Sequence, residues 1–273
     1  KVYRKVAFDI VKEHGEEVFP EPSSEAETKP SPTSAKNESI QVTKQERSPM
    51  AVPPKVSVVI NEEQLRDYLG PPIYHKDRMY TNTMPAGVAL GLGYLGNGSG
   101  SLMPIETTLM PGKGNLHLTG KLGDVIKESA SIALSWVKSH AYELGLTKEP
   151  GDTLLDHRDV HLHMPEGAIG KEGPSAGVAF AVSLISLLTD RSLPTKLAMT
   201  GEVSLRGMVL PVGGLKEKLL AAHRAGITTV ILPAHNRPSV EAAVPKSVLD
   251  DLEVHYVTNV WAALDVAFGP GPR

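Results

Sequence analysis

The sequence predicts an α/β or α+β fold with a mixed sheet. From about Met84 onward, segments of alternating apolar residues are interleaved with amphipathic helical segments, which is the pattern of helices layered on a sheet. Apolar residues make up 41% of the 273 residues and aromatic residues only 5%, so the core is expected to be built mainly from Ala, Val, Leu and Ile. The sequence contains no internal repeat.

The chain is expected to divide into segments 1–18, 19–54, 55–83 and 84–273. Apolar residues recur on one face of residues 1–14, which predicts a helix. Residues 19–54 are rich in Pro, Ser, Glu, Lys and Thr and almost lack large apolar groups, which predicts a disordered linker. Order is expected to return with a short strand at residues 55–60. A helix to Leu69 follows, capped reciprocally by Asn61 and Gln64.

The main domain is expected to alternate between strands and helices. Strands are predicted at residues 88–94, 101–110, 116–118, 160–164, 197–205, 209–212, 229–232 and 254–257. Helices are predicted at residues 124–144, 174–188 and 215–225, near Val240, and after a cap at Thr258.

Composition excludes several classes of function. The formal net charge is −3 with both signs interspersed, which argues against a nucleic-acid partner. The absence of cysteine excludes a disulfide framework, a cysteine nucleophile and a thiolate metal site. No apolar run approaches the roughly 20 residues of a membrane span, so no membrane partner is expected. Residue 1 lies inside the first predicted helix, which suggests a piece of a longer protein.

Ser175 is the first candidate for chemistry. In the segment GPSAG at residues 173–177, a glycine turn leads into a predicted helix, with Pro174 suited to its first turn. Small neighbours leave room for a substrate backbone, and free N–H groups at a helix start can stabilise an oxyanion. The alternative is that Ser175 merely caps a buried helix, as serine often does.

A serine nucleophile needs a base, and the sequence leaves two kinds open. The first kind is histidine, with candidates at His157, His161, His163 and His223. His161 and His163 share one face of a predicted strand. They could also hold a metal ion, with further ligands from His157, Asp156 or Asp159.

The second kind of base is a lysine that burial has made neutral. Residues 215–225 predict a helix on which Lys218 shares a face with small apolar residues. Lys216 lies over a bulkier face of the same helix. The pattern favours Lys218 as the desolvated lysine.

These segments together resemble the proteolytic domain of Lon proteases. The matching blocks cover nearly all of residues 84–268 in the family's order. They include PEGA at 165–168, KEGPSAG at 171–177, MTGEVSLRG at 199–207 and LKEKLLAAHRAG at 215–226, with PGKG at 111–114 and residues 118–130. The resemblance implies a Lon-type protease domain with mixed sheets.

The resemblance also implies roles for individual residues. Ser175 matches the catalytic serine and Lys218 the catalytic lysine of a Ser–Lys dyad. Thr200 matches a threonine whose hydroxyl orients the lysine. Glu172 stands where the family often carries Asp, close to the serine. His161 and His163 match supportive positions. Glu106 and Arg206 match positions with structural or subunit-interface roles.

The family implies a larger assembly. Its members form homo-hexameric rings with an AAA+ ATPase module before the protease domain. Residues 1–18 and 55–83 resemble parts of that module's small subdomain. No G-x-x-x-x-G-K-[ST] motif occurs in the chain, so ATP and Mg are expected to bind elsewhere in the protein, and no cofactor is expected here. The polar segment 19–54 suggests a eukaryotic mitochondrial member, located in the matrix or otherwise in the cytoplasm.

The expected function is therefore ATP-dependent serine endopeptidase activity on unfolded protein substrates, which would be misfolded, damaged or regulatory proteins. One alternative is a Lon-fold module that serves only oligomerisation or binding, although such a module would be expected to lack Ser175 or Lys218. The other is a metal hydrolase centred on His161 and His163.

Overall fold

The computed structural model describes residues 2–18, 57–61, 64–70, 80, 82–95, 98–165 and 171–269. The chain forms two compact units, Lys1–His75 and Lys76–Arg273. The predicted linker at residues 19–54 lies outside the described residues. None of the helices in the described part is long and apolar enough to cross a bilayer.

The first unit contains α1 (Val2–Val18) and α2 (Leu65–Leu69). The predicted capping pair is confirmed, because Asn61 N–H donates to Gln64 Oε1 at 3.2 Å and Gln64 N–H donates to Asn61 Oδ1 at 2.9 Å. Lys5 Nζ donates to the Asp67 carbonyl and joins the two helices at 3.2 Å. Residues 57–60 do not form the predicted strand, and the rest of that segment lies outside the described residues.

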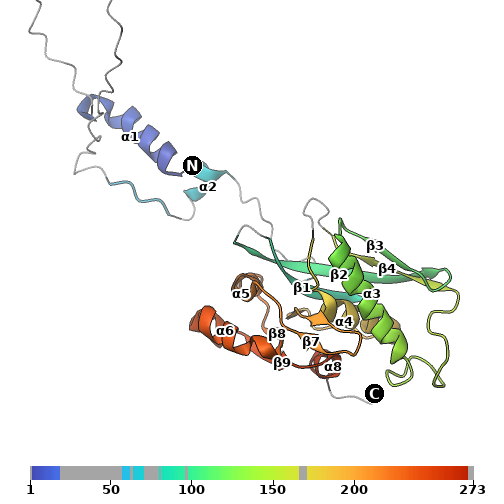
Figure 1. The fold of residues 1–273 in the computed structure, drawn as a ribbon. Coiled ribbons are helices and arrows are strands. Elements are labelled where there is room, and N and C mark those ends of the chain that lie inside the picture. Colours follow the sequence, from blue (N-terminus) through green and yellow to red (C-terminus); the bar gives the residue numbers. More distant parts are fainter. Residues whose placement is uncertain are drawn as a thin grey trace, which may run out of the picture. The chain divides into compact units, whose positions relative to one another are not determined.

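The second unit is built on a mixed sheet, which confirms the predicted fold class (Figure 1). The described strands have the order β3-β4-β2-β1-β5-β8-β9. β2 is antiparallel to both β1 and β4, and the remaining neighbours are parallel. The strands are β1 (Val88–Tyr94), β2 (Gly100–Pro111), β3 (Leu116–Thr119), β4 (Arg158–His163), β5 (Leu197–Met199), β8 (Thr229–Pro233) and β9 (Glu253–Val257). A separate hairpin pairs β6 (Glu202–Val203) with β7 (Val209–Leu210).

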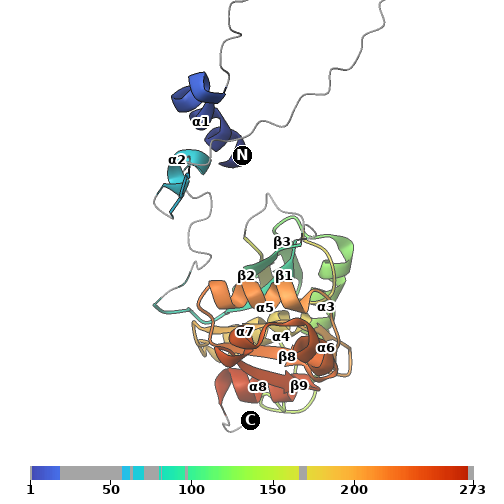
Figure 2. The same ribbon diagram turned by 90° about the vertical axis from the view of Figure 1, so that its left-hand side faces the viewer.

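Helices cover the sheet. α3 (Asp124–Ser139) lies beside α4 (Gly177–Thr189), which packs on β1 and β2 (Figure 1). α5 (Leu215–Arg224) contacts the same two strands and lies next to α6 (Arg237–Ala243) and α7 (Lys246–Asp250), as Figure 2 shows. The 3₁₀ turn η1 (Ala234–Asn236) leads into α6, and α8 (Val260–Phe268) packs on α4. α4 and α5 thereby bring two helix starts to the same pair of strands.

The core is formed mainly by Ala, Val, Leu and Ile, as the composition predicts. Its largest fully buried side chains are Trp136 and Phe180. Trp136 stacks on His140 with ring centroids 4.5 Å apart. α3 ends at Ser139, earlier than predicted. The hydroxyl of Ser139 and the ring of His140 both bond the Trp136 carbonyl, and such side-chain bonds compete with continued helix.

Three other predicted boundaries are also corrected by the structure. The predicted strand at residues 197–205 breaks after Met199, because the Gly201 N–H bonds the Ser175 carbonyl instead of a strand. α4 begins at Gly177, so Pro174 and Ser175 precede the helix. α8 is capped by the Asn259 side chain, which accepts from Ala262 N–H, and not by Thr258.

Asp159 organises the turn between β2 and β3. Its carboxylate accepts from Lys113 N–H at 2.6 Å, from Asn115 N–H at 2.8 Å and contacts His117 Nε2 at 2.9 Å. A Cβ on Gly112 would overlap this carboxyl group. These bonds, the one to His117 above all, hold the pKa of Asp159 well below its usual range.

Replacing Asp159 by alanine is therefore expected to destabilise the protein. Because its pKa is lowered by folding, the charged carboxylate stabilises the fold above the unfolded value of about 3.9. That contribution is lost as the pH falls from there towards the folded pKa. The gap in melting temperature between wild type and Asp159→Ala should be smaller at pH 3 than at pH 7. Asp156→Ala is the matched control, because Asp156 is exposed in the turn just before β4. An equal gap at both pH values would contradict this account.

Candidate active site

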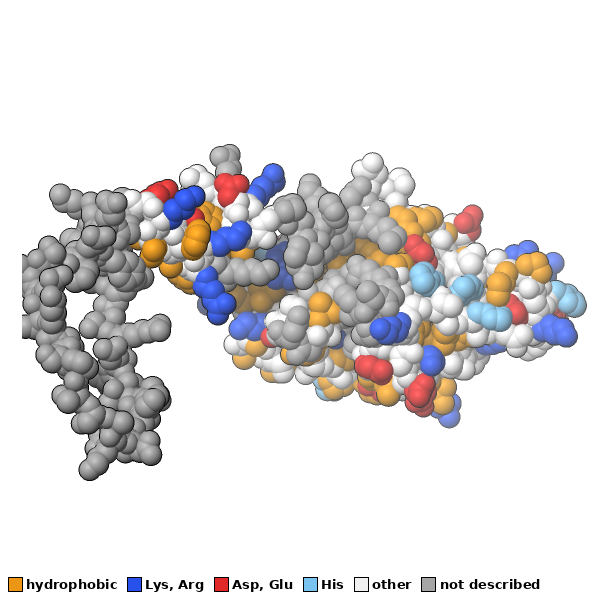
Figure 3. Space-filling model, turned by 90° about the horizontal axis from the view of Figure 1, so that it is seen from above, with side chains coloured by type: hydrophobic (Ala, Val, Ile, Leu, Met, Phe, Trp, Pro, Cys, Tyr) orange, Lys and Arg blue, Asp and Glu red, His pale blue; other side chains and the backbone are white. Residues whose placement is uncertain are grey.

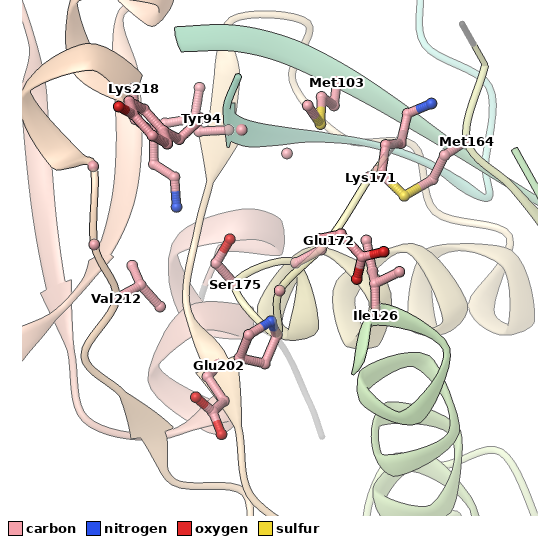
Figure 4. Close-up of a pocket in the computed structure, with 18 of the residues that line it drawn as sticks. Tyr94, Met103, Ile126, Met164, Lys171, Glu172, Ser175, Glu202, Val212 and Lys218 are labelled. Atoms are coloured by element: carbon pink, nitrogen blue, oxygen red, sulfur yellow. The ribbon is translucent and has the colours of Figure 1, made fainter. Parts of the chain in front are cut away.

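A cavity of about 560 Å³ lies between the ends of β1 and β2, the segment before α4 and the start of α5 (Figure 4). Ser175 and Lys218 both point into it. Its remaining walls are formed largely by glycines and apolar side chains, among them Met103, Ile126 and Met164. The sheet and two helices thus bring together a hydroxyl and an amine that are far apart in the sequence.

Ser175 sits in a tight turn just before α4. The Ser175 carbonyl accepts from Gly201 N–H at 2.8 Å, and the Gly201 carbonyl accepts from Val178 N–H at 3.0 Å. Gly177 is needed here, since a Cβ at this position would lie 2.8 Å from Val203 N. The loop after β5 therefore fixes the backbone of Ser175 from one side.

Lys218 is one of the largest fully buried side chains of the described residues, with 2% of its surface exposed. It lies on α5 among Leu215, Ala221 and Ala222, which are buried too. Burial lowers the pKa of Lys218 from 10.5 to about 8. Lys216, on the same helix, is exposed. The neutral amine, which a general base requires, is therefore much more populated near physiological pH than it is in an exposed lysine.

Thr200 joins the lysine to the serine. Its hydroxyl is fully buried; it donates to the Ser175 carbonyl at 3.1 Å and accepts from Lys218 Nζ at 3.0 Å. This polarity matters, because an amine that donates a hydrogen to Thr200 keeps its lone pair free for another proton. Thr200 thereby orients the amine relative to the turn that carries Ser175.

Backbone donors for an oxyanion are also present. Within the described part of the chain, the N–H groups of Ser175 and Ala176 have no hydrogen-bond acceptor. Both residues line the cavity. Such donors stabilise negative charge that develops on a substrate carbonyl. Further donors are expected in the loop at residues 167–172. Residues 167–170 lie outside the described residues, and the Lys171 N–H is already bonded to the Lys121 carbonyl.

Of the other site residues predicted from the sequence, one lines the cavity and four lie outside it. Glu172 lines the cavity, whereas Glu106, Arg206, His161 and His163 do not. His161 and His163 share the Thr119 hydroxyl, at 2.9 Å and 2.6 Å. Figure 3 shows histidines gathered on one face of the molecule. Glu106 accepts from the Tyr80 hydroxyl at 2.5 Å, and Arg206 is exposed in the turn between β6 and β7.

The metal-hydrolase alternative finds no support in this arrangement. No group of three or more His, Cys, Asp or Glu residues that could hold a metal ion occurs in the ranges that the structure describes. Asp159 is engaged by the turn at residues 113–115 and by His117.

Several residues of the cavity were not predicted from the sequence. They are Tyr94, Met103, Ile126, Lys171 and Glu202. Lys171 is buried and its Nζ donates to the Gly120 carbonyl at 3.1 Å. For Lys171, the only indication in the sequence was its position inside the KEGPSAG block. The other four residues lie on strands and helices, where the periodicity of apolar residues predicts burial but does not identify a site.

Comparison with known proteins points to one family. Residues 59–269 match the model of the Lon protease (S16) C-terminal proteolytic domain. The chain is 43% identical over 268 residues to "Lon protease homolog 2, peroxisomal" of Xenopus laevis, covering 98% of this chain and 30% of the relative. The protein of the same name from Mus musculus is 44% identical over 238 residues, covering 87% of this chain and 27% of that protein. That of Oryza sativa subsp. indica is 47% identical over 214 residues, covering 78% and 24%.

These comparisons correct the expected location. The relatives are named peroxisomal, so the prediction of a mitochondrial protein of the matrix is wrong. It rested on the composition of residues 19–54, and composition alone does not identify a cellular compartment. The chain spans between 24% and 30% of the length of these relatives.

Proposed function

The chain belongs to the Lon protease family, and on this premise we propose that it is the proteolytic part of an ATP-dependent serine endopeptidase that uses Ser175 and Lys218 as a catalytic dyad. The observation that carries the proposal is the buried chain of hydrogen bonds from Lys218 through Thr200 to the backbone of Ser175. A lysine whose pKa is lowered by burial can act as a general base, and a serine in the same cavity is then activated as the nucleophile.

The proposed reaction is amide hydrolysis through an acyl-enzyme. Neutral Lys218 takes the proton of Ser175 Oγ, and the oxygen attacks the peptide carbonyl carbon. The Ser175 and Ala176 N–H groups stabilise the oxyanion. Collapse of the tetrahedral intermediate breaks the C–N bond, and Lys218 gives its proton to the leaving amine. Water then attacks the ester carbon while Lys218 accepts one of its protons. The bond between this carbon and Ser175 Oγ breaks, Lys218 returns the proton to Oγ, and the acyl part leaves as a carboxylic acid.

The whole protein's properties follow from the family as proposals. ATP and Mg would be bound by an ATPase module outside this chain, since the sequence lacks the phosphate-binding motif, and no step above uses them. Unfolded proteins would be the substrates. A peroxisomal location agrees with the names of the relatives.

Assembly into a homo-hexameric ring is likewise proposed. In its support, the hairpin β6–β7 and its turn expose apolar side chains beside Arg206, namely Leu205 at 63%, Met208 at 45% and Leu210 at 36%. Clustered exposed apolar groups are typical of surfaces that contact another protein. This hairpin agrees with the interface role expected for Arg206.

The proposed function is tested by trapping the acyl-enzyme and identifying the residue that carries the acyl group. The full-length protein is incubated with a small activated aryl ester, quenched in acid and digested. The peptide that contains Ser175 is expected to carry the acyl mass, and Ser175→Ala should abolish it while ATP hydrolysis continues. Acylation of a different residue would overturn the assignment of the nucleophile.

A further inference from the structure

The segment that leads to Ser175 is held against the residues that precede α3. Leu122 and Lys171 form a parallel β-bridge. Lys171 N–H donates to the Lys121 carbonyl at 3.2 Å, and Gly123 N–H donates to the Lys171 carbonyl at 2.9 Å. Two backbone bonds therefore set the position of Lys171 relative to the start of α3.

The carboxyl group of Glu172 lies directly over Gly123. A Cβ added to Gly123 would overlap the Glu172 carboxyl group, whose atoms are its three nearest neighbours. Gly123 is the N-cap residue of α3, and no side-chain hydrogen bond caps this helix from that position. Figure 4 shows Glu172 beside Ile126, at the first turn of α3, and not directed at Ser175. A carboxylate in this place is attracted by the positive end of a helix.

A second contact joins α3 to the same segment. Ser129 Oγ, one turn further along α3, donates to the Pro174 carbonyl at 3.1 Å. Glu172 and Pro174 flank Gly173, whose φ of +94° allows the sharp bend before Ser175. Both residues that bracket the bend therefore contact the N-terminal half of α3.

We propose that Glu172 is a positioning residue: its carboxylate packs on Gly123 at the positive N-terminal end of α3 and thereby fixes the bend that presents Ser175 to the cavity. This inference rests on the proposed function of Ser175. Glu172 acts through the backbone of residues 173–175 and does not touch the reacting atoms.

Gly123→Ala is a selective probe of this contact. The φ of Gly123 is −73°, which alanine adopts without strain, and the group that must move is the flexible end of Glu172. We expect both Gly123→Ala and Glu172→Ala to lower kcat for a short peptide by roughly 10- to 100-fold with little change in KM, because small displacements of reacting groups cost about that much. The double variant should be no slower than either single variant. Glu128→Ala, an exposed carboxylate on α3, is the control and should match wild type.

Two readouts separate the possible outcomes, both measured on the full-length protein. The rate at which a small aryl ester acylates Ser175 should fall in Glu172→Ala, and Glu172→Gln should retain more of it. A raised KM with unchanged kcat and acylation would overturn the proposal and make Glu172 a substrate contact. Amide hydrogen exchange at residues 124–127 should become faster in Glu172→Ala; unchanged exchange would also overturn it. This second readout holds even if Ser175 proves not to be acylated, which would instead refute the proposed function.

Discussion

Replacing either Ser175 or Lys218 by alanine is expected to lower the rate of peptide cleavage by about 10⁴- to 10⁶-fold, which is the loss seen when a member of a nucleophile–base unit is removed. The two losses should be similar and should not add in the double variant, because the serine without its base and the base without its serine are both inactive. The measurement is cleavage of an unstructured protein by the full-length protein, with ATP hydrolysis followed in parallel.

Lys216→Ala is the matched control for Lys218→Ala. Both lysines lie on α5, but Lys216 is exposed and Lys218 is buried against Thr200. Lys216→Ala should therefore keep both cleavage and ATP hydrolysis. If Lys218→Ala still cleaved at the wild-type rate, the base would lie elsewhere, and His161 and His163 would be the next candidates to test.

The pH dependence of cleavage is expected to follow the ionisation of Lys218. Its pKa is lowered to about 8 by burial, and only the neutral amine can accept the proton of Ser175. The neutral fraction falls tenfold per pH unit below the pKa, so kcat/KM should be about 100-fold lower at pH 6 than at pH 9. A short fluorogenic peptide is the substrate of choice, because its cleavage does not require unfolding of a protein.

Two other pH profiles would exclude Lys218 as the base. A midpoint near 6.5, the ordinary pKa of histidine, would point to an imidazole. A profile that stays flat between pH 6 and pH 9 would show that no base titrates in this range. Lys216→Ala should leave the midpoint unchanged, which controls for the general effect of removing a positive charge from α5.

Sequence patterns predicted those parts of the site that depend on one element. The small apolar face of α5 indicated burial of Lys218, and the alternation in β4 put His161 and His163 on one face. Contacts between distant segments were not predictable in this way. The break after Met199 depends on a bond between Gly201 and Ser175, and neither residue's neighbours encode it.

Glu172 shows the same limit. Its sequence position suggested that its carboxylate lies close to Ser175. The carboxyl group lies instead over Gly123, which is far from Glu172 in the sequence. Gly123 permits this contact because it has no side chain. The pattern of apolar and polar residues along the sequence does not predict such a contact. Only the fold, which brings the start of α3 to residues 171–174, reveals it.

The sheet order has a consequence for the order of events during synthesis. β1 meets β5 through the pairing of Gly91 with Met199, and the cavity takes walls from both β1 and the start of α5. A nascent chain that has not yet reached α5 has neither Lys218 nor the wall it provides. Ser175 is then already translated but has no general base beside it. We therefore expect peptide cleavage to begin only after α5 has been synthesised and has packed on the sheet, so that the growing polypeptide does not cleave itself.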